Sequence, residues 1–434
     1  MQVSVEELGG LERRLTVQVP AEKVEQEVQS RLASLARRVK LDGFRPGKVP
    51  FKVVQRMYGD QVRQEVLGDL VQSSFQEAVL QHNLRPAAGP RIEPKTVAVG
   101  QDLEYYAIFE VFPEFKVQGL EGIKVERPVA EVAEADIDSM IENLRQQRTR
   151  WNEVSRAAQN GDRVTLDFEG KLEGADFPGN KGENVPLVLG SGRMIPGFEE
   201  ALIGLVGGES KTFMVTFPQD YPNKDLAGKP VSFSATVKTV AEPVLPEVDE
   251  AFVKSFGIDD GSVESLRKAL RENMERELKQ GIKAVVKRQV MQGLLDANPI
   301  DLPQALVREE IEQLARQMHF PTAGKSSEEL EKTKAELFGE EAKRRVALGL
   351  IVSRVVTENA LKLEPARVQA HLEGIAASYE DAGEVIRWYQ QNPQALESIR
   401  GLALEEQVVD WLLERAQVSD KPSSFDEIMK PNKA

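Results

Sequence analysis

The chain has 434 residues, of which 41% are hydrophobic and 29% charged, and its formal net charge at pH 7 is −14. This composition is typical of a folded protein, and the length predicts roughly two to four domains. The acidic balance argues against a general affinity for nucleic acid or an anionic membrane, and the absence of cysteine excludes disulfides and thiolate chemistry.

The N-terminal residues 1–113 are expected to form a compact α+β domain. Its strands are indicated by apolar residues at every second position, and its helices by apolar residues three and four positions apart. Pro50 suits the start of a helix. The expected elements are a strand over 13–19, a helix over 20–39, a short helix from Pro50 through Met57, a separate helix from Asp60 to about Asn83 and a strand over 102–112.

Residues 114–150 are predicted to be a connector whose second half, DIDSMIENLRQQRTRW, has a helical pattern. The sequence then changes character over residues 151–245. Glycine becomes dense, and the short runs VTLDF, KTFMVTF and VSFSATV alternate between apolar and polar residues. This pattern favours a small β-rich domain that ends before the proline-containing segment AEPVLPEVDE.

Residues 246–434 are expected to be almost entirely helical. A helical period runs over residues 263–294, and a single helix of that length would extend roughly 48 Å. We therefore predict an elongated all-α domain with helical arms. The tail from residue 419 to the end is expected to be loosely ordered. The breaks between helices are predicted at NPIDLP (298–303), FPTAG (320–324), LEP (363–365) and QNP (391–393).

The loop LDGFRPGKVP, residues 41–50, combines two turn signals with an aromatic residue and a cation. Proline followed by glycine suits a type II turn, so Phe44 and Arg45 would be presented on a stiff tip. Residues 31–56 contain eight basic residues and one acidic residue, a net charge of +7. This basic patch favours a ribonucleoprotein surface. Alternatively, Phe44 folds back between the helices and the cations form a solvated face.

The string GFRPGKVP resembles the GFRxGxxP signature of the bacterial trigger factors, which are ribosome-associated chaperones. The resemblance implies docking on the large ribosomal subunit near the tunnel exit, against a ribosomal protein and adjacent rRNA. Some members of that family carry lysine where this chain has proline. By this resemblance the ribosome-binding residues are Gly43, Phe44, Arg45, Pro46, Gly47 and Lys48.

Residues 160–240 resemble the FKBP-type peptidyl-prolyl isomerases, most specifically in the segment MIPGFEEAL. One departure is Pro178, which follows Phe177 where the family usually has an acidic residue; Asp176 is a weak substitute. The pocket residues implied by this resemblance are Phe168, Phe177, Met194, Ile195, Phe198, Tyr221 and Phe233.

Rotation of an X-Pro bond crosses a barrier of about 18–20 kcal/mol, during which the amide loses its resonance. A dry aromatic pocket favours the twisted, less polar amide, and a hydrogen bond to its carbonyl holds the rotating group. We expect that donor to be a backbone N–H near Ile195 or the Tyr221 hydroxyl. For Phe168, Phe213 or Phe217 taken singly, a purely structural place in the core is the better interpretation.

The expected chemistry needs no metal or cofactor. The three histidines, His82, His319 and His371, are scattered and lack metal-ligand spacing, and there is no phosphate-binding glycine loop. The N-terminus does not resemble a signal peptide, and no run of about 18 apolar residues predicts a membrane span. A cytoplasmic location without membrane or DNA partners is therefore expected.

Two functions are compatible with these patterns. The first is a ribosome-associated chaperone that binds nascent and unfolded polypeptides and carries an auxiliary prolyl isomerase. In that case the resemblance also implies a homodimer away from the ribosome, and a helical cradle that contacts unfolded chains through many weak apolar contacts. The second is a free-standing isomerase whose flanking domains recruit protein substrates without ribosome docking.

Overall fold

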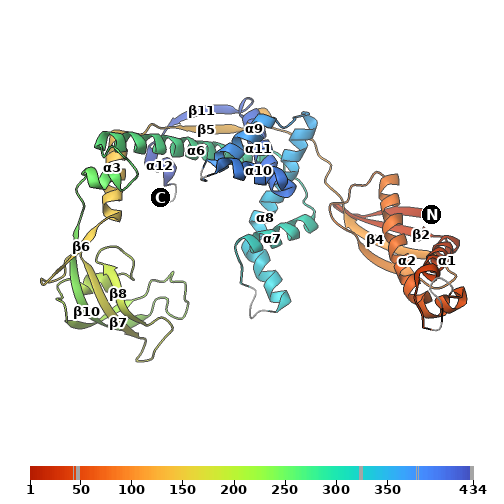
Figure 1. Cartoon of the computed structure of the whole chain (residues 1–434), viewed down its shortest axis with the longest axis horizontal. Helices are drawn as coiled ribbons and strands as arrows, with labels where there is room; N and C mark the ends of the chain where they lie inside the picture. Colours follow the sequence, from red (N-terminus) through yellow and green to blue (C-terminus); the bar gives the residue numbers. More distant parts are fainter. Residues whose placement is uncertain (43, 45–48, 322–325, 378, 380, 431–434) are drawn as a thin grey trace. The chain divides into compact units, whose positions relative to one another are not determined.

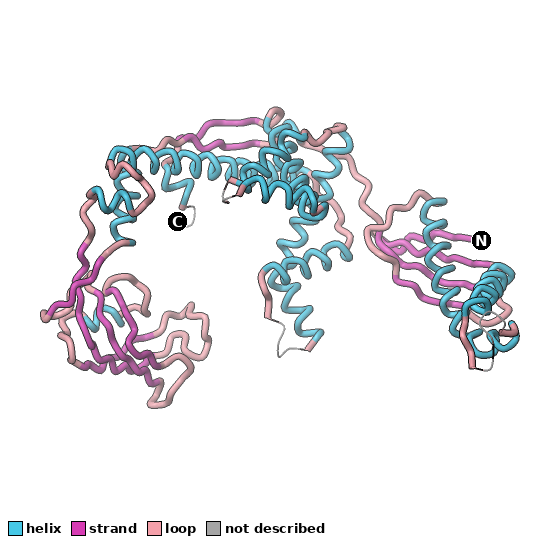
Figure 2. Tube along the Cα trace, viewed as in Figure 1, coloured by secondary structure: helices cyan, strands magenta, loops and turns pink. Residues whose placement is uncertain are grey.

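The computed structural model describes residues 1–434 except 43, 45–48, 322–325, 378, 380 and 431–434. The chain divides into two compact units, Met1–Arg127 with Ala284–Lys421, and Pro128–Lys283 with Pro422–Ala434. Figure 1 labels the elements along the chain, and Figure 2 separates helices from strands. The predicted α+β class is confirmed, with a mixed N-terminal region, a β-rich middle region and a mainly helical C-terminal region.

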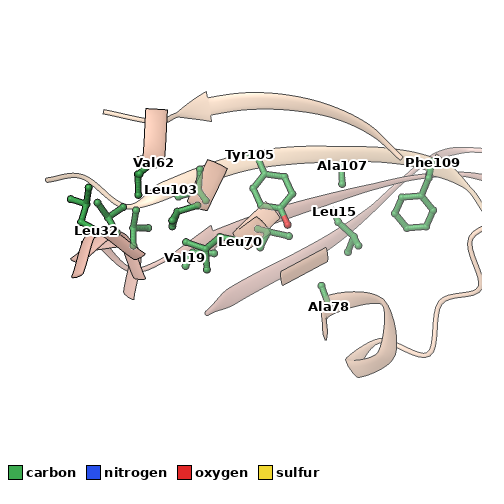
Figure 3. Packing of buried hydrophobic residues seen from close by; sticks show 14 of the residues in the cluster. Leu15, Val19, Leu32, Val62, Leu70, Ala78, Leu103, Tyr105, Ala107 and Phe109 are labelled. Atoms are coloured by element: carbon green, nitrogen blue, oxygen red, sulfur yellow. The ribbon is translucent and has the colours of Figure 1, made fainter. Parts of the chain in front are cut away.

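The N-terminal region is an antiparallel sheet of order β1-β2-β4-β3 with two helices packed against it. Figure 3 shows the buried side chains of β2 and β4, such as Leu15 and Tyr105, beside those of the two helices. Strands β1 and β3 were not predicted. The elements are β1 (Gln2–Gly9), β2 (Glu12–Val19), α1 (Ala21–Arg38), α2 (Phe51–Gln81), β3 (Arg91–Thr96) and β4 (Leu103–Glu110).

Helix α2 corrects one prediction, because it is continuous where a short helix and a separate longer one were expected. Gly59 and Asp60 lie inside it. An interior glycine costs a helix only about 1 kcal/mol. Here the buried stripe of Val54, Val62 and Val66 continues on both sides of Gly59, so packing against the core outweighs that cost.

The helical part of the first unit is interrupted at the predicted segments NPIDLP, LEP and QNP. Residues 322–324 of the predicted FPTAG break lie outside the described residues, and the interruption between α9 and α10 was not predicted. Helices α7 and α8 pack around Ile311 and Ala342, and the largely buried Lys334 donates to both carboxylate oxygens of Glu312 at 2.6 and 2.8 Å. The helices are α6 (Val263–Ala297), which belongs to both units, α7 (Gln304–Gln317), α8 (Ser327–Glu358), α9 (Pro365–Ala376), α10 (Ala382–Gln391) and α11 (Pro393–Leu413).

Two short strands also lie outside the predicted pattern. β5 (Lys124–Val129) pairs with β11 (Gln417–Pro422), so the region after residue 246 is not wholly helical. The connector before β5 is tied to the helical part by Asn298. Its side-chain oxygen accepts from the backbone N–H of Gln118 at 2.8 Å, and its amide group donates to the Gln118 carbonyl at 3.1 Å. No helix within the described ranges is long and apolar enough to cross a bilayer.

The second unit contains a five-stranded antiparallel sheet of order β6-β10-β7-β8, with β9 paired to the first half of the long strand β10. Its buried residues form one core with helix α4. The elements of the sheet region are β6 (Arg150–Val154), β7 (Arg163–Lys171), β8 (Lys181–Val188), α4 (Phe198–Leu202), β9 (Ser210–Thr216) and β10 (Pro230–Val244).

The C-terminal tail corrects a second prediction, because much of it is ordered. Helix α12 (Phe425–Met429) begins with a capping box in which the Ser424 hydroxyl accepts from the Glu427 N–H. Its Phe425 and Ile428 are buried with residues of α3 (Glu134–Gln147) and α6, while the short α5 (Glu250–Lys254) packs in a neighbouring cluster. The tail therefore completes an apolar core.

We expect Phe425→Ala to lower the free energy of unfolding by about 3 kcal/mol, because it removes a buried ring and leaves a cavity. Urea denaturation followed by circular dichroism measures this loss. The matched control is Asp426→Ala on the same helix, whose exposed carboxylate pairs with Lys430 at 2.8 Å and should contribute less than about 1 kcal/mol. Equal losses in the two variants would contradict the packing of α12.

An ion pair between the partly exposed Arg156 and the buried Asp162 fixes the turn before β7. The Arg156 guanidinium donates to both oxygens of the Asp162 carboxylate at 2.6 and 3.0 Å, and the Gln159 N–H donates to it at 2.8 Å. Chiefly because of Arg156, and despite burial, the pKa of Asp162 lies below its ordinary value of 3.8. Because the folded-state pKa is depressed, the stabilisation is complete above pH about 4 and is lost as the pH falls through the folded-state value.

Asp162→Asn should therefore be less stable than the unmodified protein at pH 7, with a smaller further loss on acidification below pH about 4. Denaturation midpoints measured between pH 3 and 7 test this difference. Parallel midpoint curves for both proteins would show that Asp162 does not have this role.

Candidate functional site

All seven residues of the predicted isomerase pocket belong to one apolar cluster of the β-rich region. Phe198 and Phe233 are buried at its centre, and the other five are half-buried around them. Phe213 and Phe217 belong to the same cluster. The structure thus places together side chains that come from two strands, three loops and one short helix.

The rings meet edge to face around Phe198. Its ring centroid lies 5.7 Å from that of Phe168, 5.3 Å from that of Phe213 and 5.2 Å from that of Phe233. A second group joins Phe217 to Tyr221 at 4.6 Å and to Phe177 at 6.3 Å. Edge-to-face pairs fix ring orientations, so the cluster is a rigid apolar surface.

Two strand glycines make room for these rings. A Cβ atom on Gly170 would lie 2.6 Å from a ring atom of Phe233, and one on Gly182 would lie 2.5 Å from a ring atom of Phe168. Real Cβ atoms do not approach other atoms so closely, so any larger residue would displace the ring. The sequence offered no signal for these two positions beyond the general density of glycine.

Asp176 was considered as a weak substitute for the acidic residue that is expected after Phe177, where this chain has Pro178. The Asp176 carboxylate accepts from the side-chain amide of Asn180 at 3.2 Å, and the same amide donates to the Gly170 carbonyl at 2.9 Å. Asp176 is thus tied to the loop between β7 and β8. Nothing in these contacts gives it the role of the acidic residue that the resemblance leads one to expect after Phe177.

Both donors that were predicted for the substrate carbonyl are available. Among the described residues, neither the backbone N–H of Ile195 nor the hydroxyl of Tyr221 has a hydrogen-bond partner. The Ile195 carbonyl accepts from the Phe198 N–H at 3.1 Å, which joins Ile195 to the first residue of α4. A polar group that enters above the rings can therefore meet an unoccupied donor.

The sequence analysis missed Glu199, a carboxylate that is 5% exposed. It accepts from the backbone N–H groups of Gly190, Gly192, Arg193 and Met194. Burial raises its pKa, but these four N–H groups outweigh burial and bring the pKa below its ordinary value. No sequence signal distinguishes Glu199 from the adjacent, exposed Glu200.

A surface depression of about 370 Å³ lies on the same loop. It shares only Met194 and Ile195 with the predicted pocket, and none of the aromatic residues lines it. No group of three or more histidine or acidic side chains that could hold a metal occurs in the part of the chain that the structure describes.

Of the six residues of the predicted ribosome-binding tip, only Phe44 lies within the described residues; Gly43, Arg45, Pro46, Gly47 and Lys48 lie outside them. Phe44 is 39% exposed and is not among the described side chains that form or contact the N-terminal core. The flanks of the loop are anchored, since Val49 is buried in that core and Leu41 packs against it. A fold-back of Phe44 into the core is therefore not observed.

The described cations around the tip are mostly unpaired. Arg31 forms an ion pair with Asp69 across α1 and α2. The remaining described cations of residues 31–56 have no ion-pair partner among the residues that the structure covers: Arg37, Arg38, Lys40, Lys52 and Arg56. Their charge is thus available to an external anion.

Three family models match the chain. Residues 1–144 match the model described as bacterial trigger factor protein, residues 262–414 match the model of its C-terminus, and residues 154–238 match FKBP-type peptidyl-prolyl cis-trans isomerase. A solved chain from the study "Promiscuous Substrate Recognition in Folding and Assembly Activities of the Trigger Factor Chaperone" aligns over 95% of this chain and 99% of its own, with 19% identity and a TM-score of 0.49.

Curated relatives match over the full length. A trigger factor of Thioalkalivibrio sulfidiphilus is 53% identical over 100% of this chain and 99% of its own, and one of Pseudomonas putida is 52% identical with the same coverage. One of Alkalilimnicola ehrlichii is 51% identical over 99% of this chain and 96% of its own. The family models and these full-length identities show that the chain belongs to the bacterial trigger factor family.

Proposed function

We propose that this protein is a chaperone that docks near the tunnel exit of the large ribosomal subunit, binds nascent polypeptides and catalyses cis/trans isomerisation of X-Pro bonds. One observation carries the isomerase part: an apolar cluster with a buried aromatic centre and a half-buried rim lies within the segment that matches the FKBP-type model. The full-length family match favours this function over a free-standing isomerase with recruiting domains. The domain limits near residues 113, 150 and 245 are part of the proposal.

The proline ring of the substrate would enter above Phe198 and Phe233, which form the buried floor of the cluster. Half-buried Phe168, Phe177 and Tyr221 would surround it and exclude water. A planar amide is more polar than a twisted one, so a dry apolar surface lowers the barrier to rotation. The side chains need only hold the ring while the rest of the peptide turns.

The carbonyl that precedes proline needs a partner as it rotates out of conjugation. The Ile195 N–H and the Tyr221 hydroxyl are the two donors of the predicted set without a partner among described residues. A donor that is already in place stabilises the twisted state without reorganisation. Met194 and Ile195 would form the apolar edge from which the N–H projects.

Docking would use the tip around Phe44. An exposed ring on a loop whose flanks are fixed in the core can enter an apolar pocket of a ribosomal protein at little entropic cost. The unpaired cations of α1 and α2 would face rRNA phosphates. The other five predicted tip residues, Gly43, Arg45, Pro46, Gly47 and Lys48, belong to the same proposal.

Contacts with unfolded chains would be spread over the helical region. In that region Met274, Met291 and Leu294 are buried in ordinary helix packing, whereas Met318 is exposed. Other exposed apolar side chains in this region include Leu337, Tyr379, Trp388 and Leu402. Scattered apolar side chains suit weak binding of many sequences. A homodimer away from the ribosome and a cytoplasmic location complete the proposal.

Phe44→Ala/Arg45→Ala should weaken ribosome binding at least about tenfold, because it removes both the apolar anchor and a cation of the tip. Co-sedimentation with 70S ribosomes over a salt series measures the affinity. The unmodified protein should bind saturably and more weakly as salt rises.

The matched control is Lys23→Ala/Leu80→Ala. It also removes one exposed cation and one exposed apolar side chain, at the ends of α1 and α2 remote in sequence from the loop. Equal losses in the two double variants would contradict a specific role of the tip. Unmodified protein that stays in the supernatant at low salt would refute ribosome docking altogether.

Phe198→Leu should lower kcat/KM for isomerisation of a proline-containing tetrapeptide at least about tenfold, because the ring surface under the proline is lost. Suppression of aggregation of an unfolded client should persist, since it depends on the helical region. Protease-free isomerisation assays and light scattering give the two readouts.

The control Phe213→Leu changes a ring of the same cluster that is outside the predicted pocket. Its activity should stay within about threefold of the unmodified protein, although both variants lose packing against neighbouring rings. If Phe198→Leu abolished both activities, the proposed separation of isomerase and chaperone functions would be wrong.

A further inference from the structure

Glu199 is the one buried charged side chain in the proposed isomerase site, among the described residues, to which the reaction assigns no role. A carboxylate with so little exposure needs partners for both oxygens, since an unpaired buried charge is very costly. Its partners reveal what the charge holds in place.

Five donors converge on this carboxylate from one loop. One oxygen accepts from the N–H groups of Gly190 at 2.7 Å and Gly192 at 3.2 Å. The other accepts from the N–H groups of Arg193 at 2.9 Å and Met194 at 3.1 Å, and from the Ser191 hydroxyl at 3.3 Å. Hydrogen bonds to an ionised acceptor are stronger than neutral ones, so the loop is tightly held.

The loop backbone is shaped for this contact. Gly190 and Gly192 have φ values of +87° and +67°, which turn successive N–H groups toward a common centre, as in anion-binding nests. A Cβ atom on Gly190 would also lie 2.1 Å from the side-chain oxygen of Asn160. In this molecule the anion bound by the loop is the protein's own Glu199.

The loop ends at the predicted substrate donor. Met194 provides the last of the four backbone N–H groups held by Glu199, and Ile195 is the next residue, with an N–H that has no acceptor among the described residues. Glu199 itself follows Phe198 on α4. One helical turn therefore fixes the aromatic floor through Phe198 and the loop through Glu199.

We infer that Glu199 is a positioning residue for isomerisation, which holds the loop so that the Ile195 N–H projects over the ring of Phe198. This inference rests on the proposed isomerase function. The proline ring would still bind if the loop loosened, because its binding surface is aromatic. Only the hydrogen bond to the rotating carbonyl would weaken, so the effect falls on kcat rather than on KM.

The test is Glu199→Gln in the full-length protein. The substitution keeps the size of the side chain, but it removes the charge and directs an NH₂ group at N–H donors. We expect kcat for a proline-containing tetrapeptide to fall about tenfold, with KM within twofold. Glu199→Asp retains the charge and should lose less kcat than Glu199→Gln, again with KM nearly unchanged.

Glu200→Gln is the matched control. This exposed neighbour accepts from the Gly197 N–H alone, at 2.9 Å, and its substitution should leave kcat within twofold. An unchanged kcat in Glu199→Gln, a change confined to KM, or an equal loss in Glu200→Gln would overturn the inference. If Glu199→Gln does not fold, as judged by circular dichroism, Glu199→Asp decides: reduced kcat with the original KM supports positioning, and an unchanged kcat overturns it.

Failure of the proposed isomerase function would give different results from failure of the positioning role of Glu199. If Phe198→Leu leaves isomerisation intact, the aromatic cluster is not the site, whatever the Glu199 variants do. If Phe198→Leu abolishes isomerisation while Glu199→Gln has no effect on kcat, the site stands and only the positioning role fails.

Discussion

The proposed isomerase site depends on keeping a small apolar surface rigid. Helix α4 has only five residues, yet Phe198 and Glu199 anchor it on two sides. The Phe198 ring meets three other rings, and the Glu199 carboxylate binds four backbone N–H groups. Preorganisation of this kind is what catalysis by differential binding of a twisted amide requires.

Much of this site could be predicted because it consists of large side chains. The seven predicted residues lie in one cluster, although their role in catalysis stays a prediction. The residues that support the aromatic cluster could not be predicted from the sequence. Gly170 and Gly182 act by allowing close approach of the rings, and no sequence pattern distinguishes them from other glycines. Glu199 acts through backbone contacts, and no sequence pattern distinguishes it from Glu200.

The same distinction holds for the fold. The long helix α6 was predicted because it carries its own apolar pattern. Strands β5 and β11 and helix α12 were missed because their order comes from partners far away in the chain. α12 has too few residues to be stable alone, and it forms because Phe425 and Ile428 complete a core with α3 and α6. In α2, tertiary packing likewise overrode a local signal, since Gly59 did not end the helix.

Charge distribution separates the proposed docking tip from the rest of the chain. Residues 31–56 carry a net charge of +7 in a chain whose total is −14, so the remainder is strongly acidic. At physiological salt, charges act over about 10 Å or less. The tip would therefore be attracted to rRNA only at close range, while acidic surfaces elsewhere would be repelled when they approach it. Such a balance would favour one orientation of docking over adhesion by any face.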